Sequence, residues 1–439
     1  MKRQAEQKLL QWKDSPRRKP LILRGARQVG KTWLVETFLA KHFDHFIKID
    51  LEKNKDLHSC FDENLDPKRI LNLLEISTEK IVPGRTLLFL DEIQACPRAI
   101  MALRYFYEEL PELHIVAAGS LLEFAFAEIS VPVGRVQYLH VFPLTFNEYL
   151  MALGRTKMAE LIRENPALIL QSAHEQILKE LKNYFFIGGM PECVKVWRDT
   201  SSMVTVGEAQ SEIIDSYRDD FSKYTPRTDP TCLDAVLLNV AKSVGEQLKY
   251  TQLNEGHTGP TNRKAFDLLA KARIIQKIPS CNPSGLPLGA TANPKKFKAA
   301  FLDIGLMQRL CRIPIDEEIK QNNLLAIYRG KLAEQFVAQE MLATDELFYW
   351  SREKHGSNAE VDYLSVRNGT IYPVEVKSGS SGSLRSLHLM LETYPNCPEG
   401  LVLSTRLYDQ LPEQKLLFIP LYSAAILTDS EIPINFSHL

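Results

Sequence analysis

The chain has 439 residues, of which 45% are hydrophobic and 24% charged, a composition typical of folded globular proteins. This length predicts two to four domains and excludes a single small core. The formal net charge of -1 gives no overall attraction to a polyanion, so a nucleic-acid surface would have to be a local patch.

The cysteines and the amino-terminal segment indicate the compartment. The seven cysteines form no C-x-x-C pair, so neither a disulfide framework nor a zinc knuckle is predicted. The first twenty residues lack the apolar core of a signal peptide, and no run of about 18 apolar residues occurs. We therefore expect a soluble, cytoplasmic protein with no membrane partner.

The stretch KPLILRGARQVGKTWLVETFLAKHF predicts a strand at 21–23, a loop and an amphipathic helix. The loop fits the pattern G-x-x-x-x-G-K-[ST]. Backbone N–H groups of such a loop surround a phosphate, its lysine reaches the β- and γ-phosphates, and its threonine binds Mg²⁺. ATP and Mg²⁺ are therefore the expected cofactors. The predicted nucleotide-binding residues of the loop are Gly25, Ala26, Arg27, Gln28, Val29, Gly30, Lys31 and Thr32.

The stretch RTLLFLDEIQACP supplies two carboxylates at the end of a second strand. Leu87 to Leu90 predict a buried parallel strand, and ligands of α/β sheets bind beyond the carboxyl ends of such strands. We expect Asp91 to bind Mg²⁺ and Glu92 to orient or deprotonate the attacking water. An acidic helix cap would explain either carboxylate alone but explains both poorly.

Further strands are predicted at 45–52, 114–120 and 136–144, with helices between them, so the first 150 residues alternate as an α/β fold with a parallel sheet. GARQVGKT, LLFLDEIQ, a strand ending at Ser120 and VGRVQYLHVFPLTFNEYL resemble a prokaryotic branch of the AAA+ ATPases. The resemblance implies assembly-linked ATP hydrolysis, with Ser120 sensing the γ-phosphate and Arg135 acting as a trans-acting or sensor arginine. A surface ion pair is the alternative for Arg135. Hexamers are typical of the class, so a homo-oligomer is an open expectation.

Residues 226–315 resemble a winged helix, with helices in TCLDAVLLNVAKSVG and TNRKAFDLLAKARIIQ and then a β wing. DNA is the candidate partner of this segment through a basic strip, and a protein contact is the alternative. The strip would comprise Arg263, Lys264, Lys271, Arg273, Lys295, Lys296 and Lys298.

The stretch AEVDYLSVRNGTIYPVEVKSG predicts a β-hairpin that turns at Asn368 and Gly369, because both positions of a type I′ turn need positive φ. In this register Asp362 lies across from Glu375, and Glu360 across from Lys377, on one face. Opposed carboxylates repel unless a cation lies between them, and such pairs are ligands for Mg²⁺ or Mn²⁺. The other face is apolar and comprises Val361, Tyr363, Tyr372, Val374 and Val376.

This hairpin and the helix YRGKLAEQFVAQEML before it resemble the PD-(D/E)XK nucleases over roughly residues 320 to 425. The resemblance implies a metal site of Glu334, Asp362 and Glu375, with Lys377 as a catalytic residue. Pro373 departs from the pattern and is expected at an edge or a bulge. Two alternatives stay open: an exposed ion pair between Glu360 and Lys377, and a degenerate nuclease-like fold used for binding.

The predicted fold class is α/β, in four parts: an AAA+ P-loop ATPase domain (1–150), a helical lid or linker (151–225), a winged-helix-like domain (226–315) and a PD-(D/E)XK nuclease-like domain (316–439). This order is similar to a group of prokaryotic AAA ATPases with a C-terminal domain of unknown function. The leading hypothesis is an ATP-hydrolysing enzyme whose C-terminal part engages DNA. The alternative is an ATP-switched protein-interaction module with an inactive nuclease fold. A small-molecule kinase fits poorly, because Glu92 directly follows Asp91.

Overall fold

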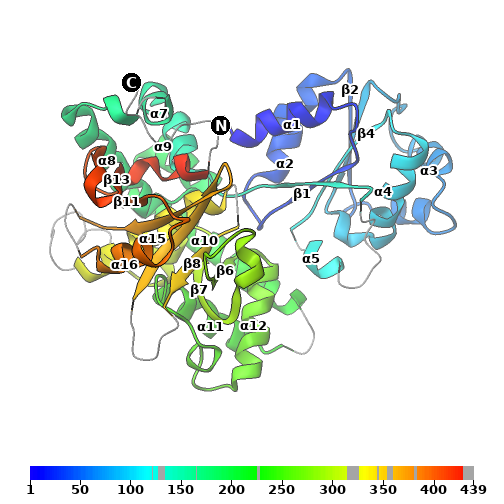
Figure 1. Ribbon diagram of the computed structural model, residues 1–439. Helices are drawn as coiled ribbons and strands as arrows, with labels where there is room; N and C mark the ends of the chain where they lie inside the picture. The colour runs from blue at the N-terminus through cyan, green and yellow to red at the C-terminus, as the bar shows by residue number, and fades with distance from the viewer. Residues whose placement is uncertain are drawn as a thin grey trace. The chain divides into compact units, whose positions relative to one another are not determined.

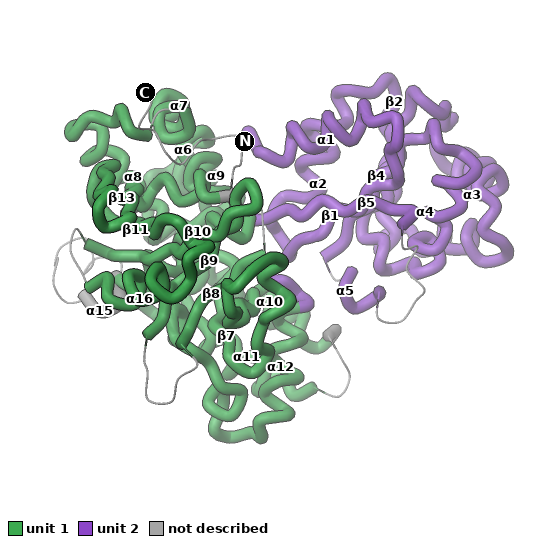
Figure 2. Tube along the Cα trace, in the orientation of Figure 1, with its two compact units in different colours: residues 1, 143–270, 274–439 green, residues 2–142, 271–273 purple. Residues whose placement is uncertain are grey.

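The computed structural model describes residues 1–120, 122–126, 134–164, 166–224, 228–313, 326–343, 346–352, 359–379 and 383–428. The chain divides into two compact units, drawn in purple and green in Figure 2. The N-terminal unit contains residues 2–142 and 271–273, and the C-terminal unit contains residue 1, residues 143–270 and residues 274–439. Within the described ranges, no helix is both long and apolar enough to cross a bilayer.

The N-terminal unit is built on a sheet of five parallel strands in the order β2-β3-β4-β1-β5 (Figure 1). β4 therefore lies between β1 and β3, and the loops that follow these three strands meet at one edge of the sheet. The predicted parallel α/β sheet is confirmed. The strands are β1 Leu21–Arg24, β2 His45–Asp50, β3 Thr86–Asp91, β4 His114–Ala118 and β5 Gln137–His140.

Helices pack on this sheet through a buried apolar cluster that includes Ile49, Leu88 and Leu90 of the strands together with Ile70 and Leu103 of the helices. Burial of such side chains is the main force that holds helices on a sheet. The helical elements are α1 Gln4–Asp14, η3 Lys55–Phe61, α3 Pro67–Leu74, η4 Ile93–Ala95, α4 Pro97–Glu109 and α5 Leu122–Ala125.

The helix predicted after the phosphate loop forms in three consecutive segments, α2 Lys31–Trp33, η1 Leu34–Phe38 and η2 Leu39–His42. The middle segment widens into a π-helical turn and the last one tightens into 3₁₀ geometry. The apolar face predicted for this helix is buried, with Leu34, Val35 and Leu39 fully buried. The regular α-helix expected from the sequence is therefore wrong in its winding, although its direction and buried face are as predicted.

The C-terminal unit begins with a helical segment. Its long helix α8 ends at Ile187, directly before Gly188. Gly188 has φ 75°, and a Cβ there would lie 2.1 Å from an oxygen of Asp303, so this position accepts only glycine. The helices are α6 Phe146–Ala152, α7 Thr156–Glu164, η5 Pro166–Leu168, α8 Gln171–Ile187, α9 Pro191–Thr200, α10 Met203–Tyr224, α11 Pro230–Lys242, η6 Tyr250–Gln252, α12 Gly259–Lys271, η7 Leu288–Thr291, α13 Ile304–Leu310, α15 Ala326–Leu342, α16 Arg385–Thr393, η8 Pro412–Gln414 and η9 Leu421–Thr428.

A mixed sheet of eight strands forms the other layer of this unit, in the order β12-β13-β11-β10-β9-β8-β6-β7. Helix α16 packs on β9, β10 and β11 through a buried cluster with Leu387, Met390, Leu364 and Val402. Helix α15 packs on β7 and β10. The strands are β6 Ile275–Ser280, β7 Asn293–Phe301, β8 Phe348–Ser351, β9 Glu360–Arg367, β10 Thr370–Val376, β11 Gly400–Ser404, β12 Asp409–Leu411 and β13 Leu416–Pro420.

The predicted wing and the predicted nuclease-like hairpin contribute strands to this one sheet. β6 and β7 form an antiparallel hairpin, and β6 continues the sheet through its pairing with β8 at Ser280 and Tyr349. The hydroxyls of Ser280 and Ser351, 3.0 Å apart, add a side-chain link between the same strands. The division of the chain into four domains stays a prediction.

The hairpin register is confirmed. β9 and β10 pair from Thr370 opposite Arg367 to Val374 opposite Tyr363, and both turn residues have positive φ. β10 is an internal strand of the sheet, so the edge position expected for Pro373 is wrong for the strand as a whole. The ladder between β10 and β11 begins only at Val374, and Pro373 therefore lies just outside it, where its missing N–H leaves no gap in that ladder.

Candidate functional site

The phosphate loop follows the carboxyl end of β1 and is closely packed. A Cβ at Gly25 would lie 2.2 Å from the carbonyl oxygen of Val141, so only glycine fits. Gln28 and Gly30 have φ of 65° and 92°. Such positive φ values let successive backbone N–H groups turn toward one point, where they can bind an anion. Arg3, directly before α1, donates to the carbonyl of Val29 in the loop at 3.2 Å.

Lys31 folds back on the loop in this structure. Its ammonium donates to the carbonyls of Gly25 and Ala26, at 2.9 and 2.7 Å. Burial lowers the pKa of Lys31 to about 8, although Glu92 and Asp91 act in the opposite direction. Burial removes the water that stabilises the charged ammonium, and a bound phosphate would supply negative charge in its place. Lys31 is therefore suited to an anionic ligand.

Thr32 and Asp91, the two residues predicted to bind Mg²⁺, lie next to each other. The Thr32 hydroxyl donates to an Asp91 oxygen at 3.3 Å. Lys48 of β2 lies 3.0 Å from the same carboxylate oxygen and 2.7 Å from Glu36. A carboxylate next to a hydroxyl supplies the oxygen ligands that Mg²⁺ prefers. In this structure the ammonium of Lys48 pairs with that carboxylate.

Glu92 and Ser120 complete this edge of the sheet. Glu92 directly follows β3 and has φ 47°, an uncommon conformation for a residue with a side chain. The amide of Gln94 donates to the Glu92 carboxylate, and a Cβ at Gly119 would lie 2.0 Å from the Gln94 oxygen. Ser120 follows β4, which lies between β1 and β3. Gln94 therefore connects the predicted base with the predicted sensor loop.

Arg135 lies at the opposite edge of the sheet. It precedes β5, whose Gln137 is opposite Leu21 at the start of β1, whereas the phosphate loop follows the end of β1. The four residues of β1 span roughly 13 Å. Arg135 is about half exposed and forms an ion pair with Glu108 at 3.1 Å. Arg135 therefore lies at the other edge of the sheet from the phosphate loop of its own chain, and its role as a sensor or trans-acting arginine stays a prediction.

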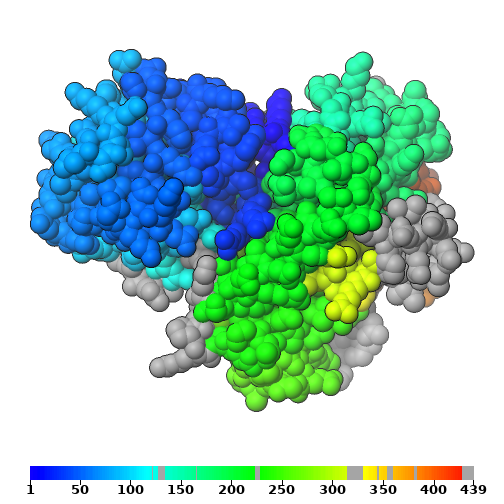
Figure 3. Space-filling view, turned by 180° about the vertical axis from the view of Figure 1, so that it is seen from behind, coloured from blue at the N-terminus to red at the C-terminus, as the bar shows by residue number. Residues whose placement is uncertain are grey.

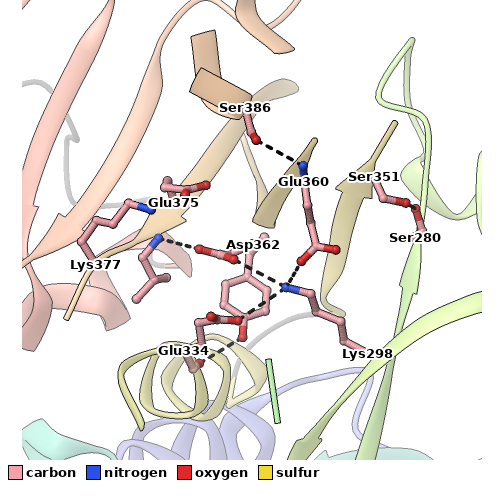
Figure 4. Close-up of polar contacts among 11 residues, drawn as sticks. Ser280, Lys298, Glu334, Ser351, Glu360, Asp362, Glu375, Lys377 and Ser386 are labelled. Carbon is pink, nitrogen blue, oxygen red and sulfur yellow. Dashed lines mark hydrogen bonds and ion pairs between the residues drawn. The ribbon is translucent and has the colours of Figure 1, made fainter. Parts of the chain in front are cut away.

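In the C-terminal unit, the predicted acidic residues converge on a lysine that the sequence analysis placed elsewhere (Figure 4). The ammonium of Lys298, on β7, lies 2.5 Å from Glu360, 3.4 Å from Glu334 and 3.5 Å from Asp362. Lys298 is 1% exposed, so it cannot belong to a DNA-facing strip. We call Lys298, Glu334, Glu360, Asp362, Glu375 and Lys377 the carboxylate cluster.

The second lysine of the cluster, Lys377, directly follows β10 and pairs with a carboxylate of that strand. Lys377 donates to Glu375 at 2.6 Å, while Glu360 pairs with Lys298. The alternative of an ion pair between Glu360 and Lys377 is therefore wrong, because the closer cation for Glu360 comes from β7. The other oxygen of Glu375 is buried and has no hydrogen-bond partner among the described residues.

Burial and mutual repulsion set the charges of the cluster. Burial and the neighbouring Asp362 raise the pKa of both Glu334 and Glu375, and burial also raises the pKa of Glu360. Burial alone would lower the pKa of Lys298, but Asp362, Glu334 and Glu360 together hold it well above its ordinary value. The surrounding carboxylates therefore favour the charged form of Lys298.

The predicted metal site of Glu334, Asp362 and Glu375 stays a prediction. Within the described residues, no group of three or more His, Cys, Asp or Glu side chains is arranged to hold a metal ion. Arg273 is also excluded from the predicted DNA-facing strip. Its side chain is only 26% exposed and pairs with Glu123 at 3.0 Å.

Three residues of these sites were not predicted from the sequence: Arg3, Lys48 and Gln94. Lys298 was predicted for the basic strip and not for the carboxylate cluster. Lys298 carries one signal, because it stands within the run FKAAF, whose other residues are apolar and buried. A charged side chain within a buried run needs a partner, which is the cue that could have found Lys298. Lys48 is exposed on β2, and the sequence gives no such cue for it.

Comparisons with known proteins match the chain in three consecutive parts. Residues 17–150 match the family model of an AAA domain, AAA_14. Residues 178–317 match a domain of unknown function, DUF8612, and residues 329–423 match another, DUF4143. No curated protein matches the chain significantly.

Among solved structures, the Walker-type ATPase PABY2304 of Pyrococcus abyssi is 17% identical over 71% of this chain and 96% of its own, with a TM-score of 0.45. The Drosophila ORC bound to DNA is 11% identical over 69% of this chain and 91% of its own, and PCH-2 of C. elegans is 12% identical over 45% and 62%, each with a TM-score of 0.26. At these TM-scores we infer nothing from the three structures. The chain therefore carries an ATP-binding domain of the AAA ATPase family, followed by two domains of unknown function.

Proposed function

We propose that the N-terminal unit hydrolyses ATP with Mg²⁺ at the carboxyl edge of its sheet. The observation that carries the proposal is the contact between Thr32 and Asp91, 3.3 Å, beside a glycine-rich loop on which the buried Lys31 is folded back. The loops that follow β1 and β3, two strands on either side of β4, thus bring a hydroxyl, a carboxylate and an ammonium to one edge of the sheet.

Each residue has a distinct role in the proposed reaction. Lys31 leaves the loop carbonyls and neutralises the β- and γ-phosphates, while the loop N–H groups hold them. Thr32 and Asp91 would hold Mg²⁺, which when bound neutralises charge that develops on the phosphate oxygens. Glu92 accepts a proton from the attacking water, and Gln94 positions its carboxylate. Ser120 follows the strand between these loops and contacts the γ-phosphate.

The test is the variant Glu92→Gln, which keeps the shape of the side chain and removes the base. We expect nucleotide binding close to that of the wild type and phosphate release slower by about 10²–10⁴-fold. Glu79→Gln, at an exposed glutamate of the same unit, is the matched control. Lys31→Ala and Asp91→Ala should also lose turnover. Hydrolysis at the wild-type rate in Glu92→Gln would remove Glu92 from the mechanism.

For the C-terminal unit we propose DNA binding, with a protein partner as the alternative. The supporting observation is that Arg263 and Lys264 remain exposed on α12, and Lys295 on the β6–β7 hairpin. Helices α10 to α12 form a continuous exposed surface, drawn in green in Figure 3. A basic helix beside a hairpin is the arrangement that winged helices use on DNA.

Salt dependence separates DNA from a protein partner. Arg263→Ala with Lys264→Ala should weaken binding to a DNA duplex and lower the slope of log affinity against log salt by about one per lost phosphate contact. Lys195→Ala with Arg198→Ala removes the same two charges from exposed positions on α9 and is the matched control. Equal effects of both double variants, or no binding by the wild type, would favour the protein partner.

A further inference from the structure

A buried cation lies among the carboxylates of the C-terminal unit. Figure 4 shows Lys298 reaching from β7 toward Glu360, Asp362 and Glu334, which come from β9 and α15. The lysine lies in the part of the chain that matches one domain of unknown function, and the carboxylates in the part that matches the other. The cluster is therefore assembled from two segments that are joined in one sheet.

The position of Lys298 is specified by more than charge. Its side chain is 1% exposed, and its ammonium lies over the ring of Tyr349, 5.3 Å from the centroid. The backbone carbonyl of Glu334 accepts a hydrogen bond from Tyr363 at 3.0 Å, which fixes the helix that carries this carboxylate. A buried ammonium is tolerated only when carboxylates surround it, and three do.

Each carboxylate that would hold a metal ion already has a partner on at least one oxygen, although the second oxygen of Glu375 has none among the described residues. One oxygen of Asp362 faces Lys298, and the other accepts from the backbone N–H of Val376 at 2.8 Å. One oxygen of Glu375 accepts from Lys377 at 2.6 Å. Mg²⁺ needs ligand oxygens at about 2.0–2.1 Å in near-octahedral geometry. A dication placed among these oxygens would also face two ammonium groups.

We propose that the ammonium of Lys298 is the resident cation of the carboxylate cluster and takes the place of a divalent metal ion. Lys298 offsets the repulsion between Glu334, Glu360 and Asp362, which a metal would otherwise have to offset. The C-terminal unit then binds its partner without Mg²⁺ or Mn²⁺ and does not cleave phosphodiesters by a metal-dependent route. The inference concerns a site separate from ATP hydrolysis and stands whether or not the chain hydrolyses ATP.

The test measures Mn²⁺ binding by the full-length chain without nucleotide, in an Asp91→Ala background that removes the other candidate cation site. With Lys298 present, we expect no Mn²⁺ binding that depends on Asp362. Lys298→Met, which removes the charge but keeps the length, should bind one Mn²⁺ at least about tenfold more tightly than the background chain. Adding Asp362→Asn to Lys298→Met should abolish this binding, whereas Lys295→Met, at an exposed position on the same strand, should gain none.

Two results would overturn the proposal: Mn²⁺ binding by the background chain that Asp362→Asn abolishes, or a folded Lys298→Met chain that binds no Mn²⁺. Cooperative thermal unfolding establishes that the variant is folded, and its melting temperature should rise with Mn²⁺. Should Lys298→Met not fold, Lys298→Met with Glu360→Gln removes the closest pair together and keeps the other three carboxylates. Lys298→Arg keeps the charge and should bind no Mn²⁺.

Discussion

Glu340 of α15 is a buried carboxyl group whose protonation state makes the stability of the C-terminal unit depend on pH. It is 1% exposed, and one of its oxygens accepts from the backbone N–H of Phe146 at 2.8 Å. The other oxygen has no hydrogen-bond partner among the described residues. Burial raises the pKa of Glu340 to about 8 from the ordinary 4.5, with a smaller contribution from Glu148. The residue is therefore neutral in the folded protein at pH 7.

The sign of the pH dependence follows from this shift. The folded state binds the Glu340 proton more tightly than the unfolded state, so the stability that Glu340 contributes is complete below about pH 4.5 and is lost as the pH rises through about 8. At about 1.4 kcal/mol per pH unit, the interval corresponds to up to about 5 kcal/mol. Glu340→Gln keeps an acceptor for Phe146 and cannot ionise, so its stability should not carry this dependence.

The assay is chemical denaturation of wild type and Glu340→Gln between pH 5 and pH 9, followed by a signal from the C-terminal unit. Because other raised carboxyl groups contribute to both chains, the informative quantity is the difference in free energy of unfolding between them. The wild type should lose stability relative to Glu340→Gln as the pH rises. Glu413→Gln, at an exposed glutamate, should show no such difference. A difference that is constant with pH would refute the assignment of Glu340 as a neutral buried acid.

Three further substitutions test the two units. Gly25→Ala should abolish nucleotide binding, measured by titration with a fluorescent ATP analogue, because its Cβ would overlap a backbone carbonyl. Lys48→Met should lower the melting temperature of the nucleotide-free chain, and Mg²⁺ with ATP should reduce the deficit, since Asp91 then has another cation; an equal deficit in both states would contradict this. Gly369→Ala, at φ 77° in open space, should cost about 1 kcal/mol, whereas Gly285→Ala, also in open space, should cost nothing measurable by denaturation.

The nucleotide site could be predicted from patterns of residues that are close together in the chain. The strand, loop and helix around Gly25 to Thr32 are contiguous in the chain, and so are the strand and the carboxylates of Asp91 and Glu92. Because parallel strands expose their carboxyl ends at one edge, two such segments are sufficient to predict where they meet. The contact between Thr32 and Asp91 fits this expectation.

The register of the hairpin could also be predicted from residues that are close together in the chain. Asn368 and Gly369 fix a two-residue turn, and the pairing of Tyr363 with Val374 then follows by counting along the two strands. Nothing beyond a dozen residues on either side enters this prediction, which is why it holds.

The partners of the lysines were decided by tertiary structure. In the sequence, Lys298 is one of three lysines in KKFKAAF, and nothing there distinguishes its partners. Only the pairing of β6 with β8 brings it to carboxylates that follow 36 to 64 residues later. Lys48 meets Asp91 only because β2 lies beside β3. An ion pair depends on which strands are neighbours, and a one-dimensional pattern carries no information on that order.

The sequence by itself determined the phosphate loop, the carboxylates that follow β3 and the turn at Asn368, because each depends on residues adjacent in the chain. Tertiary structure decided that Lys298 is buried among Glu334, Glu360 and Asp362, and that Arg135 lies at the edge of the sheet away from the phosphate loop. Burial and neighbouring charges set the state of an ionisable group, and both are properties of the folded chain.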